Sequence, residues 1–286
     1  MAERLRIAIQ KKGRLSEESL EKIKTCGIKF GTSSRVLKES ATNFPLDFLY
    51  VRDDDIPKYV EDGVADIGIV GRNEVDEQEK DLDIIRDLGF ASCRLSVAVP
   101  HGFTYTGLQS LEGKRIATSY PHILKKVLDK QGVSASFVTV TGSVEITPAI
   151  GVADAICDLV STGATLAMNG LVEVEAIYKS TAVMIGSKML SVERKVILDR
   201  FLVRLDAVMK AQNYKYIMFN LPEAQLKKVA DIIGGMKSPT VTPLMEKGWI
   251  SVQTVICEDT FWEDFEQLKA LGAQGILVTP IEKMTE

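Results

Sequence analysis

The chain has 286 residues, of which 45% are hydrophobic and 26% charged, a composition typical of a globular protein with two or three domains. Its formal net charge of -4 at pH 7 argues against nucleic-acid binding, which requires a basic surface. No run approaches the roughly 18 apolar residues that a membrane span needs. Residues 1–4 lead straight into a strand without a signal-peptide core, so we expect a cytoplasmic protein that does not bind membranes.

The cysteines exclude two further classes of protein. They are scattered along the chain without C-x-x-C spacing, which argues against a zinc site and against a disulfide framework. We therefore expect buried thiols at Cys26, Cys93, Cys157 and Cys257.

The first half of the chain alternates predicted strands and helices, as an α/β fold does. It begins with a strand over residues 5–10 and a basic loop, after which Ser16 has the position of a helix N-cap. Loops that follow strands lie at the ligand edge of a doubly wound sheet, so Lys11 and Arg14 either hold phosphate oxygens or form a solvated basic turn. Further strands are predicted at 48–51, 66–70, 93–99, 114–118 and 134–140, helices at 54–62 and 123–131, and a crossover into a second lobe at 100–102.

The phrase GVAD occurs twice, at residues 63–66 and 151–154, each time between the end of a helix and a buried strand. Two lobes built on one pattern suggest α/β domains that face each other across a cleft, and open α/β sheets bind ligands at the carboxyl ends of their strands. The alternative is a common helix-to-strand junction, because four residues are too few to prove a duplication.

Residues 151–166, GVADAICDLVSTGATL, are the most informative segment. A buried strand ends in the loop 161–165, whose backbone N–H groups can cradle a phosphate dianion. Asp158 lies three residues before the loop, within reach of ribose hydroxyls. Asp154 lies on the same strand face but roughly 13 Å away, so one metal ion cannot be held by both. The alternative is a strand, a turn and a buried or capping aspartate, because S-T-G-x-T alone is a weak motif.

The remainder of the chain changes in character. Residues 173–185 are expected to run back to the first lobe, and a helix is predicted over 192–212. The last part then follows the order βαββαβ, which is ferredoxin-like and common in small-molecule sensors and oligomerisation domains. Its predicted strands are 214–220, 240–246, 249–257 and 275–280, and its predicted helices are 222–233, with Pro222 in the first turn, and 261–271.

Six longer motifs, in order along the chain, carry a family resemblance. They are KGRLSEESL at 12–20, CRLSVAVP at 93–100, ATSYPHILK at 117–125, EITPAIGVADAICDLVSTGATL at 145–166, MKSPTVTPL at 236–244 and ILVTPIEKM at 276–284. On these motifs almost the whole chain resembles the long form of the ATP phosphoribosyltransferase family, which opens histidine biosynthesis.

The resemblance implies an α/β fold with a two-lobed core similar to periplasmic binding proteins. One lobe would take residues 1–95 and 180–212, the other 96–179, and a ferredoxin-like C-terminal domain over 213–286 would bind histidine as a feedback inhibitor. It also implies Mg²⁺, transfer of phosphoribosyl from phosphoribosyl pyrophosphate to N1 of ATP with release of pyrophosphate, and homodimers that assemble into homohexamers.

The resemblance carries site residues with it, although ordinary strand and loop structure is the alternative for each. The loop would hold the 5′-phosphate and Asp158 the ribose, within a phosphoribosyl pyrophosphate signature of Asp154, Asp158, Ser161, Thr162, Gly163, Ala164 and Thr165. Pyrophosphate or ATP contacts from the opposite lobe would come from Lys11, Arg14, Asp66, Arg72 and Arg94. Histidine would lie near Asn220, Met236, Thr240 and Gly275. Asn73 stands where many relatives have an acid, and Asn220 where some do.

The expected chemistry needs no protein nucleophile, because N1 of adenine already carries a lone pair. The protein mainly has to position the reactants and neutralise the leaving group. Histidine catalysis is poorly supported by His101 and His122, the only two histidines, and the second is expected to be structural. If a carboxylate assists proton loss, we expect Glu145 or Asp158, and we expect no metal held by the protein alone.

Two other functions remain open. A two-lobed binding protein or sensor without catalysis would need the cleft but not the S-T-G-A-T loop. A phosphoribosyltransferase of another class would carry paired acids where Leu159 and Val160 stand.

Overall fold

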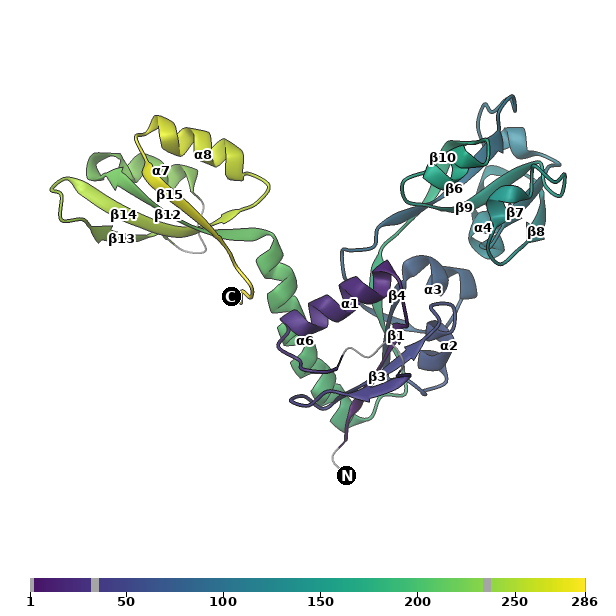
Figure 1. The fold of residues 1–286 in the computed structure, drawn as a ribbon, viewed down its shortest axis with the longest axis horizontal. Coiled ribbons are helices and arrows are strands. Elements are labelled where there is room, and N and C mark those ends of the chain that lie inside the picture. Colours follow the sequence, from purple (N-terminus) through teal and green to yellow (C-terminus); the bar gives the residue numbers. More distant parts are fainter. Residues whose placement is uncertain (1–2, 32–35, 234–237, 286) are drawn as a thin grey trace. The chain divides into compact units, whose positions relative to one another are not determined.

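The structure is a computed structural model that describes residues 3–31, 36–233 and 238–285 (Figure 1). It divides into two compact units, Met1–Glu21 with Ile28–Ile197 and Lys22–Gly27 with Leu198–Glu286. The first unit contains two sheets and the second contains one.

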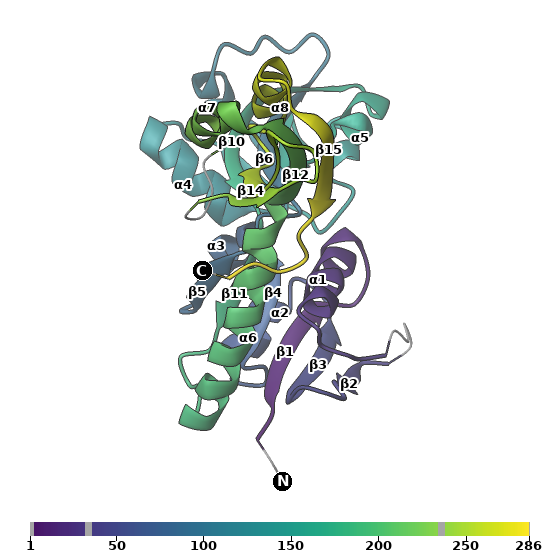
Figure 2. The same cartoon turned by 90° about the vertical axis from the view of Figure 1, so that its left-hand side faces the viewer.

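The first sheet forms lobe I, and its strands can be followed in Figure 2. Its strands run in the order β2-β3-β1-β4-β11-β5, where β1, β3 and β4 are parallel and β11 is antiparallel to β4. Ile7, Phe48 and Ile67 are fully buried, as the central strands of a covered parallel sheet require. The elements are β1 (Leu5–Gln10), α1 (Arg14–Thr25), β2 (Lys38–Ser40), β3 (Leu46–Val51), α2 (Ile56–Glu61), β4 (Ile67–Gly71), α3 (Arg72–Gln78), β5 (Asp83–Asp87) and β11 (Ala182–Gly186).

The second sheet forms lobe II, with the order β10-β6-β9-β7-β8. Its apolar residues Ile116, Leu124 and Cys157 belong to one buried cluster between sheet and helix. The elements are β6 (Cys93–Pro100), η1 (Leu108–Leu111), β7 (Arg115–Thr118), α4 (Pro121–Gln131), β8 (Ser136–Thr139), η2 (Val144–Ile146), β9 (Ala155–Val160), α5 (Ala164–Met168) and β10 (Leu171–Ser180).

The two lobes share one strand order. In lobe I it is β3-β1-β4-β11-β5 and in lobe II β8-β7-β9-β6-β10, each with three parallel strands followed by an antiparallel strand. The two copies of GVAD precede β4 and β9, which occupy the same place in this order. The prediction of two lobes on one pattern is therefore confirmed.

The predicted crossover at residues 100–102 is wrong. β6 already pairs with β9 and β10 in lobe II, so the chain passes between lobes before Cys93. Residues 100–103 instead form a turn, closed by a hydrogen bond from the Phe103 N–H to the Pro100 carbonyl. The return to lobe I falls between β10 and β11. The domain boundaries at 95, 179 and 212 remain predictions.

The second unit contains the predicted ferredoxin-like domain. Its antiparallel strands run in the order β13-β14-β12-β15, which confirms the fold that the βαββαβ order indicated. α7 and α8 cover one face of the sheet, where Phe219 packs with Val229 and Leu268 (Figure 1). The helix α6 (Val192–Gln212) begins in the first unit and continues into the second from Leu198. The other elements are β12 (Tyr214–Pro222), η3 (Glu223–Gln225), α7 (Leu226–Ile232), β13 (Thr240–Pro243), β14 (Trp249–Cys257), α8 (Phe261–Ala270) and β15 (Gln274–Pro280).

Several local predictions need correction. α1 begins at Arg14, because Gly13 adopts a φ of 105° and turns the chain directly into the helix, so Ser16 is a buried helical residue and not an N-cap. Pro222 ends β12 in register with Trp249 and does not start a helix. Cys26 and Cys157 are buried, whereas the other two cysteines are half-buried. Among the described residues, no helix combines the length and the apolar character of a membrane span.

Candidate functional site

The predicted phosphate loop surrounds a cavity of about 220 Å³ at the carboxyl end of β9. Gly163 has a φ of 79°, a left-handed conformation that lets the loop turn into α5. The lining residues come from the loop and its two flanking acids: Glu145, Asp158, Leu159, Val160, Ser161, Thr162, Gly163, Thr165 and Leu166. The structure therefore brings together both predicted catalytic carboxylates and most of the predicted signature, and Ala164 begins the helix that follows.

Asp158 is the most perturbed acid of this cavity. Burial raises the pKa of the Asp158 carboxyl, the negative charge of Glu145 raises it further, and a hydrogen bond from the Leu159 N–H at 2.8 Å opposes both. A partly buried carboxylate beside a polar loop is suited to accept hydrogen bonds from ligand hydroxyls.

An ion pair that the sequence analysis did not foresee supports the loop. Arg94 donates from Nε and Nη2 to the two carboxylate oxygens of Glu173, both at 2.5 Å, and from Nη1 to the Ser161 carbonyl at 3.1 Å. Ser96 Oγ donates to the same carboxylate at 2.8 Å, and the hydrogen bonds from Arg94 lower the pKa of Glu173. A bidentate charged pair of this kind fixes geometry as well as charge. Arg94 therefore holds the loop from within lobe II, and its expected place on the opposite lobe is wrong.

Asp66 has a structural partner at the start of β1. Its carboxylate accepts from the Arg6 backbone N–H at 2.7 Å and from Arg6 Nη2 at 2.9 Å, and Arg6 Nη2 also donates to the Gly63 carbonyl at 2.9 Å. Arg194 Nη1 adds a further bond at 2.9 Å. Asp66 is only 3% exposed, so the structure does not support a direct ligand contact.

Asp154 repeats this arrangement in lobe II. It accepts from the Arg115 backbone N–H at 2.9 Å and from Nη2 at 2.8 Å, and Arg115 Nη1 donates to the Gly151 carbonyl at 3.0 Å. The hydrogen bonds from Arg115 lower the pKa of Asp154 to about 2. Asp154 lies before β9, at the end of the strand opposite to the loop, and does not line the cavity. We call these two arrangements the arginine clamps, and they assign Asp66 and Asp154 to architecture.

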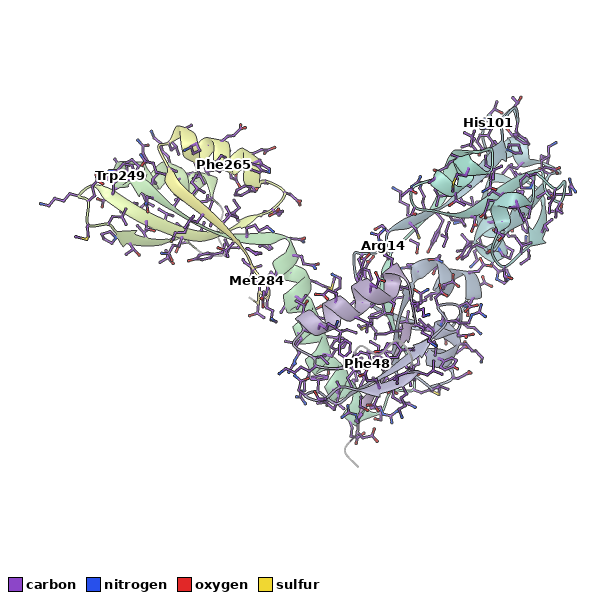
Figure 3. All side chains as sticks on the ribbon, in the orientation of Figure 1. Arg14, Phe48, His101, Trp249, Phe265 and Met284 are labelled. Atoms are coloured by element: carbon purple, nitrogen blue, oxygen red, sulfur yellow. The ribbon has the colours of Figure 1, made fainter. Side chains whose placement is uncertain are left out.

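The remaining predicted cations of lobe I gather at one sheet edge. Lys11 follows β1 and Arg72 follows β4, and these strands are parallel neighbours, so both residues lie at the carboxyl edge. Arg14 begins α1 beside that edge and pairs with Glu18 at 2.6 Å (Figure 3). Arg72 Nε donates to Asp76 at 3.4 Å.

The carboxyl edges of the two lobes touch through Asn73. Ser180 Oγ donates to Asn73 Oδ1 at 2.7 Å, and Asn73 Nδ2 donates to Tyr120 Oη at 3.2 Å. Tyr120 Oη in turn donates to Glu74 at 2.8 Å, and burial raises the pKa of Glu74. An amide suits this place because it donates and accepts at once, which explains an Asn at this position.

Glu77 completes the contact between the lobes. Its carboxylate oxygens accept from the backbone N–H groups of His122 and Ile123, both at 2.9 Å, so a residue of α3 caps the N-terminus of α4. His122 Nδ1 lies 2.8 Å from the Glu77 carbonyl, which gives this histidine the structural role expected of it. The chain carries no local signal for the contacts of Glu77, Glu74 and Glu173 with His122, Tyr120 and Arg94, because these partners are 45 or more residues away in sequence.

Comparisons with known proteins identify the family of the chain. The family model described as ATP phosphoribosyltransferase matches residues 52–207, and the one described as HisG, C-terminal domain, matches residues 211–283. A Cytophaga hutchinsonii protein named ATP phosphoribosyltransferase is 53% identical over 282 residues, covering 99% of each chain.

The chain belongs to the ATP phosphoribosyltransferase family. It is therefore a pentosyltransferase of histidine biosynthesis, as the motifs indicated. The Phocaeicola vulgatus protein of the same name is 52% identical over 280 residues, covering 98% of this chain and 99% of that one. A solved structure titled as the ATP phosphoribosyl transferase (HisG:HisZ) complex from Thermotoga maritima matches with a TM-score of 0.61 and 29% identity. It covers 72% of this chain and 98% of that chain.

The C-terminal domain of this family member brings together two of the four residues predicted to bind histidine. A Cβ on Gly275 would lie 3.6 Å from Asn220 Nδ2, and Gly275 has a φ of 58°. Thr240 is on β13, which β14 separates from β12, so it lies roughly 10 Å from the Asn220 strand. Met236 lies outside the described residues.

Within the described part of the chain, no group of three or more histidine, cysteine or acidic side chains is placed to hold a metal ion. The carboxylates that line the cavity at the phosphate loop are those of Asp158 and Glu145. Mg²⁺ prefers such hard oxygen ligands and is commonly bound by one or two carboxylates together with substrate phosphates. The donor set of this family member therefore fits Mg²⁺ only in company with a phosphorylated ligand.

Proposed function

We propose that the cavity at the carboxyl end of β9 is where this chain transfers phosphoribosyl from phosphoribosyl pyrophosphate to N1 of ATP, the first step of histidine biosynthesis. The observation that carries the proposal is a single cavity that joins the loop 161–165 to the carboxylates of Asp158 and Glu145. A binding protein without catalysis would need a cleft, but not two acids beside a phosphate loop.

The loop would hold the 5′-phosphate. Backbone N–H groups of a tight turn attract a dianion, and the hydroxyls of Ser161, Thr162 and Thr165 add donors. Asp158 would accept hydrogen bonds from the ribose hydroxyls and so fix the sugar below the incoming base. Arg94 and Glu173 would act on the substrate only through the loop. Arg94 donates to the Ser161 carbonyl, and Glu173 holds Arg94 in place.

In the reaction, the bond between the anomeric carbon and the pyrophosphate oxygen breaks, and pyrophosphate leaves with the electron pair. The lone pair of adenine N1 forms the new bond to the same carbon. The transition state carries positive charge on the sugar, which the negative charges of Asp158 and Glu145 would stabilise. One of these carboxylates, for which we favour Glu145, would accept the proton that the product's adenine loses.

The leaving group and the phosphates of ATP would be held from lobe I. Lys11, Arg14 and Arg72 share the carboxyl edge of that sheet, which supports this role. Mg²⁺ would be held by substrate phosphates together with Asp158 or Glu145, and when bound it supplies positive charge to the departing pyrophosphate.

Histidine would inhibit through the C-terminal domain. Asn220 and Gly275 form one part of the proposed site and Thr240 would belong to another, whereas Met236 is assigned to the site by the resemblance alone. The separation of Asn220 from Thr240 within one chain supports a site completed by a second copy, in a homodimer that assembles into a homohexamer. ATP and phosphoribosyl pyrophosphate are cytoplasmic metabolites, so we place the enzyme in the cytoplasm.

The test is a continuous ultraviolet assay for N1-substituted adenine, with ATP, phosphoribosyl pyrophosphate, Mg²⁺ and a pyrophosphatase, run with and without histidine. We expect a signal that requires both substrates and falls when histidine is added. Binding of both substrates by calorimetry without any signal would favour the sensor alternative.

A further inference from the structure

A larger cavity, of about 440 Å³, lies where α3 of lobe I meets α4 of lobe II. Small-molecule sites in proteins typically have volumes of about 300–1,000 Å³. Among the described residues, it shares no lining side chain with the cavity at the phosphate loop. The proposed reaction makes no use of this space.

About half of the lining of this junction cavity is apolar, and this apolar part comes from both lobes. Lobe I contributes Val75, Leu82 and Ile84, and lobe II contributes Ile123 and Val127. Ile84 remains 37% exposed on the edge strand β5, so part of the wall is open to an incoming molecule. Contact with this apolar surface would remove it from water, which favours binding.

The polar residues around the walls are mostly neutralised by neighbours. Asp76 pairs with Arg72 at 3.4 Å and accepts from Tyr178 Oη at 2.6 Å, and Glu79 pairs with Lys126 at 2.5 Å. Lys80 pairs with Glu61 at 3.0 Å.

Lys130 is different, since it lines the cavity without a carboxylate partner among the residues that the structure describes. The ion pairs around the cavity therefore leave the charge of Lys130 for a ligand, and a ligand with a single negative charge would balance it.

We propose that the junction cavity binds a small amphipathic monoanion, with its apolar body between Ile84 and Val127 and its acidic group at Lys130. A branched aliphatic or aromatic carboxylate has this chemistry. The occupant would touch both lobes at once and so resist any change in the angle between them. This site goes beyond the proposed transfer reaction, and its occupancy can be measured without either substrate.

The probe is 8-anilinonaphthalene-1-sulfonate, an aromatic monoanion that fluoresces in apolar surroundings, titrated into the full chain. We expect saturable binding that Lys130→Glu weakens about tenfold, because the charge at the acidic group is reversed. Lys125→Glu is the matched control, since Lys125 lies on the same helix, pairs with Asp129 at 2.7 Å and does not line the cavity. We expect the control to change the affinity less than about twofold.

A second variant tests the apolar wall. Ile84→Trp fills the cavity from an exposed position and should abolish saturable binding, whereas Val203→Trp on α6, also exposed, should leave it intact. Circular dichroism and melting temperatures establish that each variant folds. Three outcomes would each overturn the proposal. They are equal effects of the two lysine variants, probe binding by Ile84→Trp at the original affinity, and loss of probe binding in Trp262→Ala on α8. None of these outcomes depends on transferase activity, so the two proposals fail separately.

Discussion

The two lobes begin their corresponding strands in the same way and end them differently. Asp66 before β4 and Asp154 before β9 are both held by an arginine clamp from the neighbouring parallel strand. After β4 the chain continues as Arg72 and Asn73 in a helix that contacts the other lobe, whereas after β9 it forms the phosphate loop. The repeated phrase GVAD therefore specifies architecture, and the residues that we propose for the chemistry lie in the segments that are not repeated.

The clamps also differ in burial. The side chain of Asp66 is 5% exposed and shared with Arg194, while that of Asp154 is 35% exposed with Arg115 alone. A buried charge left without its partner is costly, whereas an exposed pair contributes little. The phrase GVAD should therefore contribute more to stability in lobe I than in lobe II.

The largest effect is expected from comparing variants of Asp158, in β9, with variants of Asp154, just before it. Asp158→Asn should lower kcat by about 100-fold or more, because a charge next to the reacting sugar is lost. Asp154→Asn, just before the same strand and outside the cavity, should lower it less than about threefold. The ultraviolet assay measures both. Equal losses in the two variants would contradict the assignment of Asp154 to architecture.

The next effect compares the clamps directly. Asp66→Ala should lower the free energy of unfolding by about 3 kcal/mol, since Arg6 and Arg194 both lose a buried partner. Asp154→Ala should cost about 1 kcal/mol or less. Urea unfolding of the full chain, followed by circular dichroism, tests this difference. The comparison fails if Asp154→Ala is the more damaging change.

A smaller effect concerns support of the phosphate loop from β10. Glu173→Gln removes the bidentate partner of Arg94 and should raise KM for phosphoribosyl pyrophosphate about tenfold, with a smaller change in kcat. Glu175→Gln is the matched control, because Glu175 lies on the same strand and accepts instead from Tyr105 Oη at 2.6 Å. A fall in kcat with KM unchanged would show that Glu173 does not act by positioning the loop.

The smallest effect is a dependence on pH. Folding lowers the pKa of Asp154 from 3.8 to about 2, so its stabilising contribution is complete above the unfolded value and is lost as pH falls through the folded one. The difference in stability between the original chain and Asp154→Asn should be constant above about pH 5 and vanish between about pH 4 and pH 2. Urea midpoints across this range measure it. A difference that grows on acidification would have the wrong sign.

Patterns that depend on neighbours in sequence were predicted well. The bounds of β1, α6 and β14 agree with the predictions, because apolar periodicity and flanking residues define them. The loop 161–165 and the carboxylates of Asp158 and Glu145 do line one cavity, and they could be named from the sequence because they lie within one segment that a family motif covers.

Properties that depend on distant partners were missed. Asp154 and Asp158 are the same residue type four positions apart, and only Arg115, 39 residues away from Asp154, distinguishes their roles. β6 is an apolar strand that would suit either sheet, so its sequence alone could not say where the chain changes lobe.

The Glu77 cap has a consequence for measuring motion. The two capped amides belong to lobe II and their acceptor belongs to lobe I, so they lose their partner whenever the lobes separate. Hydrogen exchange at His122 and Ile123 would then report how often the interface opens, while amides deeper in α4 would exchange only when the helix itself unfolds. The exchange rates of these two backbone N–H groups would therefore measure lobe opening without any added label.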